Sequence, residues 1–133
     1  MTHDRYSRNT GAVYSLQYHI VWCPKYRRKV IVGEIEHALK SLLLQKAEEL
    51  ELEIKAMEIM PDHVHLFVSS DPTDAPQRIV AQLKGYTSRM LREQFPYLKS
   101  RLPTMWSRSY FITSVGEVSA ETIKRYIEAQ KGR

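Results

Sequence analysis

Large side chains recur at every second position near the start of the chain. They are Tyr14, Leu16, Tyr18, Ile20 and Trp22, and the positions between them hold Ser15, Gln17, His19, Val21 and Cys23. A period of two is typical of a β-strand, and aromatic and β-branched residues favour strands. Proline has no N–H to donate to a neighbouring strand. The pattern therefore predicts a first strand that ends before Pro24.

A helix and two strands are predicted next. The composition from Glu34 to about Leu50 favours a helix, and its hydrophobic stripe contains Ile35, Ala38, Leu42 and Leu43. Strands are predicted at Leu52–Met60 and His63–Ser69, and the Pro61-Asp62 pair between them is a turn signal.

The second half of the chain predicts a helix, a strand and a last helix. Asp74 and Gln77 have capping-box spacing, and Pro76 suits the first turn of a helix that runs to about Phe95. One face of this helix carries Ile79, Leu83, Tyr86 and Met90. Pro96 and Pro103 bracket a predicted loop before a strand at Trp106–Thr113. Gly116 is a predicted joint, and Ser119 is a predicted cap for a helix that runs to about Gln130.

The order strand, helix, strand, strand, helix, strand matches the split βαβ of ferredoxin-like and RRM-like folds. We therefore expect an α+β protein with one domain over residues 1–133 and an additional C-terminal helix. In such folds both helices cover one face of the sheet. The first and third strands are expected to be central neighbours.

Charge and composition narrow the class of protein. The 133 residues carry 20 Lys and Arg against 15 Asp and Glu, a formal charge of +5. Basic clusters lie at residues 25–29, 89–92, 99–101 and 124–125, while acids gather between Glu34 and Glu58. This balance suits a polyanionic partner. The segment Met1–Thr10 is polar and does not resemble a secretory signal, and the single Cys23 cannot form an internal disulfide, so a cytoplasmic protein is expected.

Two histidines and one tyrosine are the candidate chemical groups. His63 and His65 are two apart on a predicted strand, so both imidazoles share one face, and Val64, Leu66 and Val68 share the other. Such a pair is either a metal half-site or two unremarkable histidines on an exposed sheet face. Tyr126 and Gln130 are four apart and share one helix face. Tyr126 is either a nucleophile or a packing residue.

Together these features resemble the HUH single-tyrosine transposases of small bacterial insertion sequences. The resemblance rests on three segments: Tyr18-His19-Ile20-Val21-Trp22-Cys23-Pro24-Lys25-Tyr26-Arg27, Met60-Pro61-Asp62-His63-Val64-His65, and Tyr126 with Gln130 on the last helix. It covers nearly the whole chain, in the expected order.

The resemblance implies roles for individual residues. His63 and His65 match two metal-binding histidines, Gln130 matches a third ligand of some members, and Tyr126 matches the nucleophile. Family members cut single-stranded DNA and hold one end as a 5′-phosphotyrosine. They recognise DNA hairpins near the element ends and work as dimers in which the tyrosine helix can serve the partner's metal site. The ligand types suit Mg²⁺ or Mn²⁺.

Other residues are candidates for support and DNA binding. His19 is expected on the same face as the histidine pair, as a second-shell group, a third ligand or an inert residue. Candidate phosphate contacts are Lys84, Arg89, Arg92, Arg101 and Arg108, and candidate stacking surfaces are Tyr97, Trp106 and Tyr110. The last helix has few apolar anchors, chiefly Ile123 and Ile127, which suits a helix that moves during the reaction.

Three alternatives stay open at the level of the sequence. The chain could be a non-catalytic binder of single-stranded nucleic acid, since RNA-recognition domains share this architecture. It could be a domesticated relative of these transposases that processes palindromes in its host genome. It could also be an interaction module with a structural metal site, which would leave Tyr126 without a role.

Overall fold

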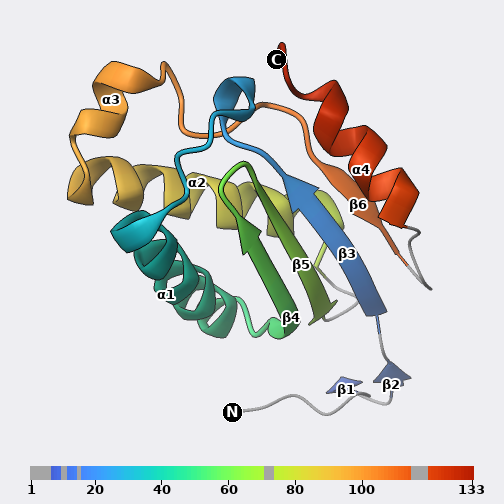
Figure 1. Cartoon of the computed structure of the whole chain (residues 1–133). Coiled ribbons are helices and arrows are strands. Elements are labelled where there is room, and N and C mark those ends of the chain that lie inside the picture. Colours follow the sequence, from blue (N-terminus) through green and yellow to red (C-terminus); the bar gives the residue numbers. More distant parts are fainter. Residues whose placement is uncertain (1–6, 10–11, 15, 71–73, 115–119) are drawn as a thin grey trace.

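The computed structural model describes residues 7–9, 12–14, 16–70, 74–114 and 120–133. A four-stranded antiparallel sheet with the order β4-β5-β3-β6 forms its centre (Figure 1). The strands are β3 (Leu16–Trp22), β4 (Glu53–Met60), β5 (His63–Ser70) and β6 (Phe111–Thr113). Helices α1 (Gly33–Glu49) and α2 (Pro76–Gln94) cover one face. The first and third strands of the predicted fold, β3 and β5, are central neighbours, as expected.

Alternation along the strands decides which face is buried. Val64, Leu66 and Val68 on β5 are fully buried and belong to one hydrophobic cluster with the inner faces of α1 and α2. The stripe predicted for α1 is confirmed, because Ile35, Leu42 and Leu43 are buried and Ala38 packs against the core. His63 and His65 consequently point to the opposite face of the sheet. None of the described helices is long and apolar enough to cross a membrane.

The last helix, α4 (Ala120–Ala129), lies on the opposite side of the sheet from α1 and α2, over β3 and β6 (Figure 1). Val21 on β3 is fully buried although its side chain points away from α1 and α2, toward the side of the sheet on which α4 lies. The predicted joint Gly116 and the predicted cap Ser119 lie outside the described residues.

The N-terminal part of the chain differs from the prediction. The first strand of the sheet begins at Leu16, and Tyr14 belongs to a separate two-stranded hairpin, β1 (Ser7–Asn9) with β2 (Ala12–Tyr14). The turn after β3 contains a short 3-10 helix, η1 (Lys25–Arg27).

The predicted capping box of α2 is wrong. The residue before the helix is Ala75, which has no side chain to cap it, and Asp74 instead approaches Arg78, with 3.3 Å between Oδ1 and Nη1. Pro76 does occupy the first turn. The predicted loop between the two prolines contains a short helix, α3 (Tyr97–Arg101), which Leu98 anchors because its side chain is fully buried.

The fourth strand is shorter than predicted. Only Phe111–Thr113 pairs with β3, and Trp106 makes an isolated bridge to Pro24. The reason lies in Lys84, whose Nζ donates to the carbonyl oxygens of Ser107 at 2.7 Å and Ser109 at 3.1 Å. These carbonyls turn toward a lysine on α2, so the segment does not offer a regular row of acceptors to a neighbouring strand.

Candidate active site

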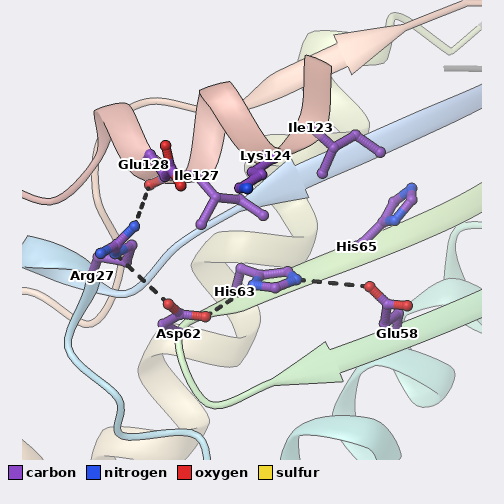
Figure 2. A pocket seen from close by; sticks show the side chains of 9 residues that line it. All are labelled: Arg27, Glu58, Asp62, His63, His65, Ile123, Lys124, Ile127 and Glu128. Atoms are coloured by element: carbon purple, nitrogen blue, oxygen red, sulfur yellow. Dashed lines mark hydrogen bonds and ion pairs between the residues drawn. The ribbon is translucent and has the colours of Figure 1, made fainter. Parts of the chain in front are cut away.

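His63 and His65 stand on the open face of β5, with their side chains toward α4 (Figure 2). His63 is oriented by its neighbour, because Nδ1 lies 2.9 Å from Oδ1 of Asp62. A hydrogen bond to a carboxylate places the proton on Nδ1 and leaves the lone pair on Nε2. Glu58 Oε1 lies 3.7 Å from that Nε2. In a neutral His63 ring, the contact with Asp62 therefore leaves Nε2 as the donor atom for a metal.

His65 is paired with His19 on the neighbouring strand. His65 Nε2 and His19 Nδ1 are 3.1 Å apart, so one of the two nitrogens carries the shared hydrogen. Burial, followed by the nearby His19, lowers the pKa of His65 below its usual value of 6.5. Neutral imidazole is the form that binds a metal. His19 thus lies beside His65 on the open face of the sheet, as expected, and contacts its Nε2.

A cavity of about 550 Å³ joins these histidines to the last helix. The sheet side contributes Glu58, Asp62, His63 and His65, and α4 faces them with Ile123, Lys124, Ile127 and Glu128 (Figure 2). Among the described residues, no three His, Cys, Asp or Glu side chains are grouped closely enough to hold a metal ion. Two oriented imidazoles fit a divalent ion as two of its ligands, and the remaining oxygen donors must come from other groups or water.

Tyr126 is on a different side of α4 from this cavity. Its hydroxyl lies 2.9 Å from Ser109 Oγ, and its ring contacts Phe111 with 5.9 Å between centroids. Burial raises the pKa of Tyr126 to about 12, although the hydrogen bond with Ser109 lowers it in part. A phenol with this pKa is almost entirely protonated near neutral pH. In this position Tyr126 does not line the histidine cavity, and its hydroxyl is not activated.

Gln130 lies on the same face of the helix as Tyr126, as predicted. It is 3% exposed, and its Oε1 accepts a hydrogen bond of 3.3 Å from Ser107 Oγ. Its Nε2 donates to the carbonyl oxygen of Tyr126 at 3.4 Å. Gln130 is absent from the lining of the histidine cavity. Within one chain the structure therefore places His63 and His65 in one cavity, with His19 beside His65, and neither Tyr126 nor Gln130 lines that cavity.

Arg27 connects the histidine pair to α4 and was not singled out from the sequence. Its Nε lies 3.7 Å from Oδ2 of Asp62, and its Nη1 donates to the carbonyl oxygen of Ile127 at 3.4 Å. Tyr26 and Arg27 both have positive φ, 58° and 53°. Consecutive left-handed residues other than glycine are uncommon and store strain. The basic cluster at residues 25–29 is visible in the sequence, but the sequence does not indicate which of its cations contacts Asp62 and α4.

The candidate DNA contacts occupy different environments. Arg101 and Arg108 are exposed, and Arg89 lies over the Tyr86 ring on the outer surface of α2. Arg92 donates to the carbonyl oxygen of Leu102 at 3.0 Å. Lys84 is committed to backbone carbonyls, as described above.

The three aromatic residues that are candidates for base stacking differ in their exposure. Tyr97 is 49% exposed and Tyr110 is half-buried, whereas Trp106 is only 5% exposed. The expectation that Trp106 stacks on bases is wrong, because its ring packs edge-on against Trp22 and its Nε1 donates to Thr87 Oγ1 at 3.0 Å. Cys23 is fully buried, and burial raises its pKa to about 12, so it is a structural thiol.

A family model described as "Transposase IS200 like" matches residues 12–130. The chain belongs to this transposase family. It is 42% identical over 125 residues to the ISDra2 transposase TnpA of Deinococcus radiodurans, which covers 92% of this chain and 89% of that protein. It is 35% identical over 119 residues to the transposase for insertion sequence element IS200 of Salmonella typhimurium, with 88% and 78% covered.

Solved structures agree with this assignment. A putative transposase from Deinococcus radiodurans R1 superimposes with a TM-score of 0.89 at 36% identity, over 96% of this chain and 99% of that chain. A REP-associated tyrosine transposase bound to a REP hairpin gives a TM-score of 0.55 at 11% identity, over 86% and 62%. The first confirms the α+β fold for an IS200-like transposase, and the second shows a related fold only.

Proposed function

We propose that this IS200-like transposase cuts and rejoins single-stranded DNA at the ends of its element, with Tyr126 as the nucleophile. The observation that carries the proposal is the pair of oriented imidazoles, His63 and His65, beside the helix that bears the tyrosine. The geometry fits a phosphoryl-transfer site, in which positioning and charge stabilisation provide most of the catalysis.

His63 and His65 would hold Mg²⁺ or Mn²⁺, with Gln130 as a third ligand. The ion would supply Lewis acidity at the scissile phosphate. Tyr126 Oη forms a bond to phosphorus and loses its proton, and the bond to the 3′ oxygen breaks. That oxygen takes up a proton and becomes a free 3′-hydroxyl, while the 5′ end stays on the protein as a phosphotyrosine. A later 3′-hydroxyl reverses the step and joins new ends.

The reaction requires α4 to leave the position described above. The hydrogen bond with Ser109 and the raised pKa of Tyr126 characterise a resting position. The apolar residues of the helix, Ile123 and Ile127, are only half-buried there. We infer that α4 docks instead over the histidines of a second copy of the chain, which places Tyr126 and Gln130 from one subunit beside His63 and His65 from the other.

The substrate is single-stranded DNA with hairpins near the element ends. A related fold has been solved with a REP hairpin bound, and exposed cations such as Arg101 and Arg108 suit phosphate contacts. Identity of 42% and 35% to insertion-sequence transposases favours a mobile element over a domesticated role.

The test is a denaturing gel of protein with Mg²⁺ or Mn²⁺ and single-stranded DNA that carries the palindromes flanking this gene. The label lies 3′ of the cut, so it stays with the protein. We expect a labelled band at protein mass that requires metal and disappears in Tyr126→Phe and in His63→Ala. An adduct that persists in Tyr126→Phe would assign the nucleophile elsewhere, and DNA binding without any adduct would favour a binding module.

A further inference from the structure

The open face of the sheet carries an aromatic pair beside His63 and His65, and the proposed cleavage step does not use the faces of these two rings. His19 on β3 and Phe67 on β5 are direct partners in the antiparallel register, so their side chains share one face. Their rings are stacked, with 4.6 Å between centroids and 23° between planes. Both residues are half-buried rather than enclosed in the core.

A cavity of about 330 Å³ opens next to this pair, lined by His19, Ala56, Met57, Glu58, His65 and Phe67. It exists because the partner of Phe67 on β4 is the small Ala56, which cannot cover the ring. The ladder between β4 and β5 shifts between Ile54 and Ala56, an irregularity of the kind that redirects side chains near functional sites.

This cavity is adjacent to the cavity at His63 and His65, since Glu58 and His65 line both. Phe67 follows His65 by two positions on the strand, a displacement of about 7 Å along the sheet. A DNA strand whose phosphate lies at the histidines therefore has a neighbouring nucleotide within reach of the aromatic pair.

We propose that Phe67 and His19 form a stacking platform for one base of the single-stranded DNA, next to the phosphate that is cut; this inference rests on the proposed function. Four-stranded sheets of this topology bind single-stranded nucleic acid by stacking bases on aromatic residues of their central strands. Here the two central strands, β3 and β5, each supply one ring. Stacking on a ring face tolerates any base, so the platform fixes the position of the strand more than its sequence.

Within the platform, the His19 side chain makes two contacts. Its ring stacks on Phe67, and its Nδ1 is hydrogen-bonded to Nε2 of His65. A base that stacks on the pair is therefore held at a fixed position relative to His65, because the His19 side chain contacts both Phe67 and His65. Positioning of this kind matters because small displacements of a reacting phosphate reduce the rate strongly.

The experiment uses full-length protein in EDTA and single-stranded oligonucleotides that span the junction flanking this gene, with 2-aminopurine at one position at a time. Stacking quenches 2-aminopurine fluorescence. We expect one quenched position next to the junction in the wild type, kept in Phe67→Trp and lost in Phe67→Ala. The affinity of Phe67→Ala should fall about tenfold, which corresponds to about 1.4 kcal/mol.

A second variant distinguishes loss of the platform from a folding defect in Phe67→Ala. Ala56→Leu leaves Phe67 in place but fills the cavity, so it should also abolish the quenching, whereas Leu44→Ala on the exposed surface of α1 should not. Quenching at no position, or quenching that is the same in Phe67→Ala and Ala56→Leu as in the wild type, overturns the platform. The adduct assay separates the two proposals. An adduct without a quench that depends on Phe67 removes only the platform, and a quench without an adduct removes only the nuclease.

Discussion

Replacing Ser109 by alanine should release the tyrosine helix from its resting position. The variant removes the 2.9 Å hydrogen bond between Ser109 Oγ and the Tyr126 hydroxyl. Tyr126 is half-buried, so water can reach its hydroxyl after the change. One such hydrogen bond contributes about 1 kcal/mol net, which corresponds to about a fivefold shift in the equilibrium between docked and undocked helix.

Hydrogen–deuterium exchange of peptides that cover α4 measures this shift. We expect exchange about fivefold faster in Ser109→Ala, with unchanged exchange in β3 and β5. Ser100→Ala is the matched control, because it removes one serine hydrogen bond, 2.9 Å to the carbonyl of Tyr97, on the separate helix α3. Exchange in α4 that is the same in Ser109→Ala as in the wild type would refute the view that Ser109 holds the helix.

Three further predictions concern the core and the proposed metal site. Leu66→Ala should lower the free energy of unfolding in urea by about 2–5 kcal/mol, because its side chain is fully buried, whereas exposed Leu44→Ala should change it little. The pKa of Cys23 is about 12 in the folded protein against an ordinary value of 9.0, so the unfolded chain loses this proton first as the pH rises. The contribution of the protonated Cys23 thiol to the free energy of unfolding is therefore complete below about pH 9 and declines toward pH 12. Thermal melts across this range should show that Cys23→Ala loses stability less steeply than the wild type as the pH rises. Asp62→Asn should weaken Mn²⁺ binding by about 10- to 100-fold in calorimetry, because the carboxylate that orients His63 is lost; unchanged affinity would contradict that role.

Much of the sheet could be predicted because its signals are local. The alternation around His63 and His65 assigns Val64 and Leu66 to the core, and the structure confirms it. The resemblance to a transposase family was also confirmed, because its motifs are spread over most of the chain in a fixed order.

The features that were missed depend on contacts between distant residues. The fourth strand is short because Lys84, more than 20 positions away, takes the carbonyl of Ser107. Arg27 reaches the carbonyl of Ile127 across 100 positions, and no periodicity in the sequence encodes such a pairing. The position of Tyr126 is a similar case, since its helix face was predicted but its partner Ser109 was not.

The most direct test of the central claim is complementation between two inactive chains. A tagged His63→Ala chain, which keeps Tyr126, is copurified with an untagged Tyr126→Phe chain, which keeps the histidines, and the pair is incubated with Mn²⁺ and the labelled flanking DNA. Our account predicts a covalent adduct at the mass of the tagged chain, formed only in the mixture. No adduct from the mixture, when a copurified tagged and untagged wild-type pair forms one, would contradict a site in which Tyr126 of one subunit acts at the histidines of the other.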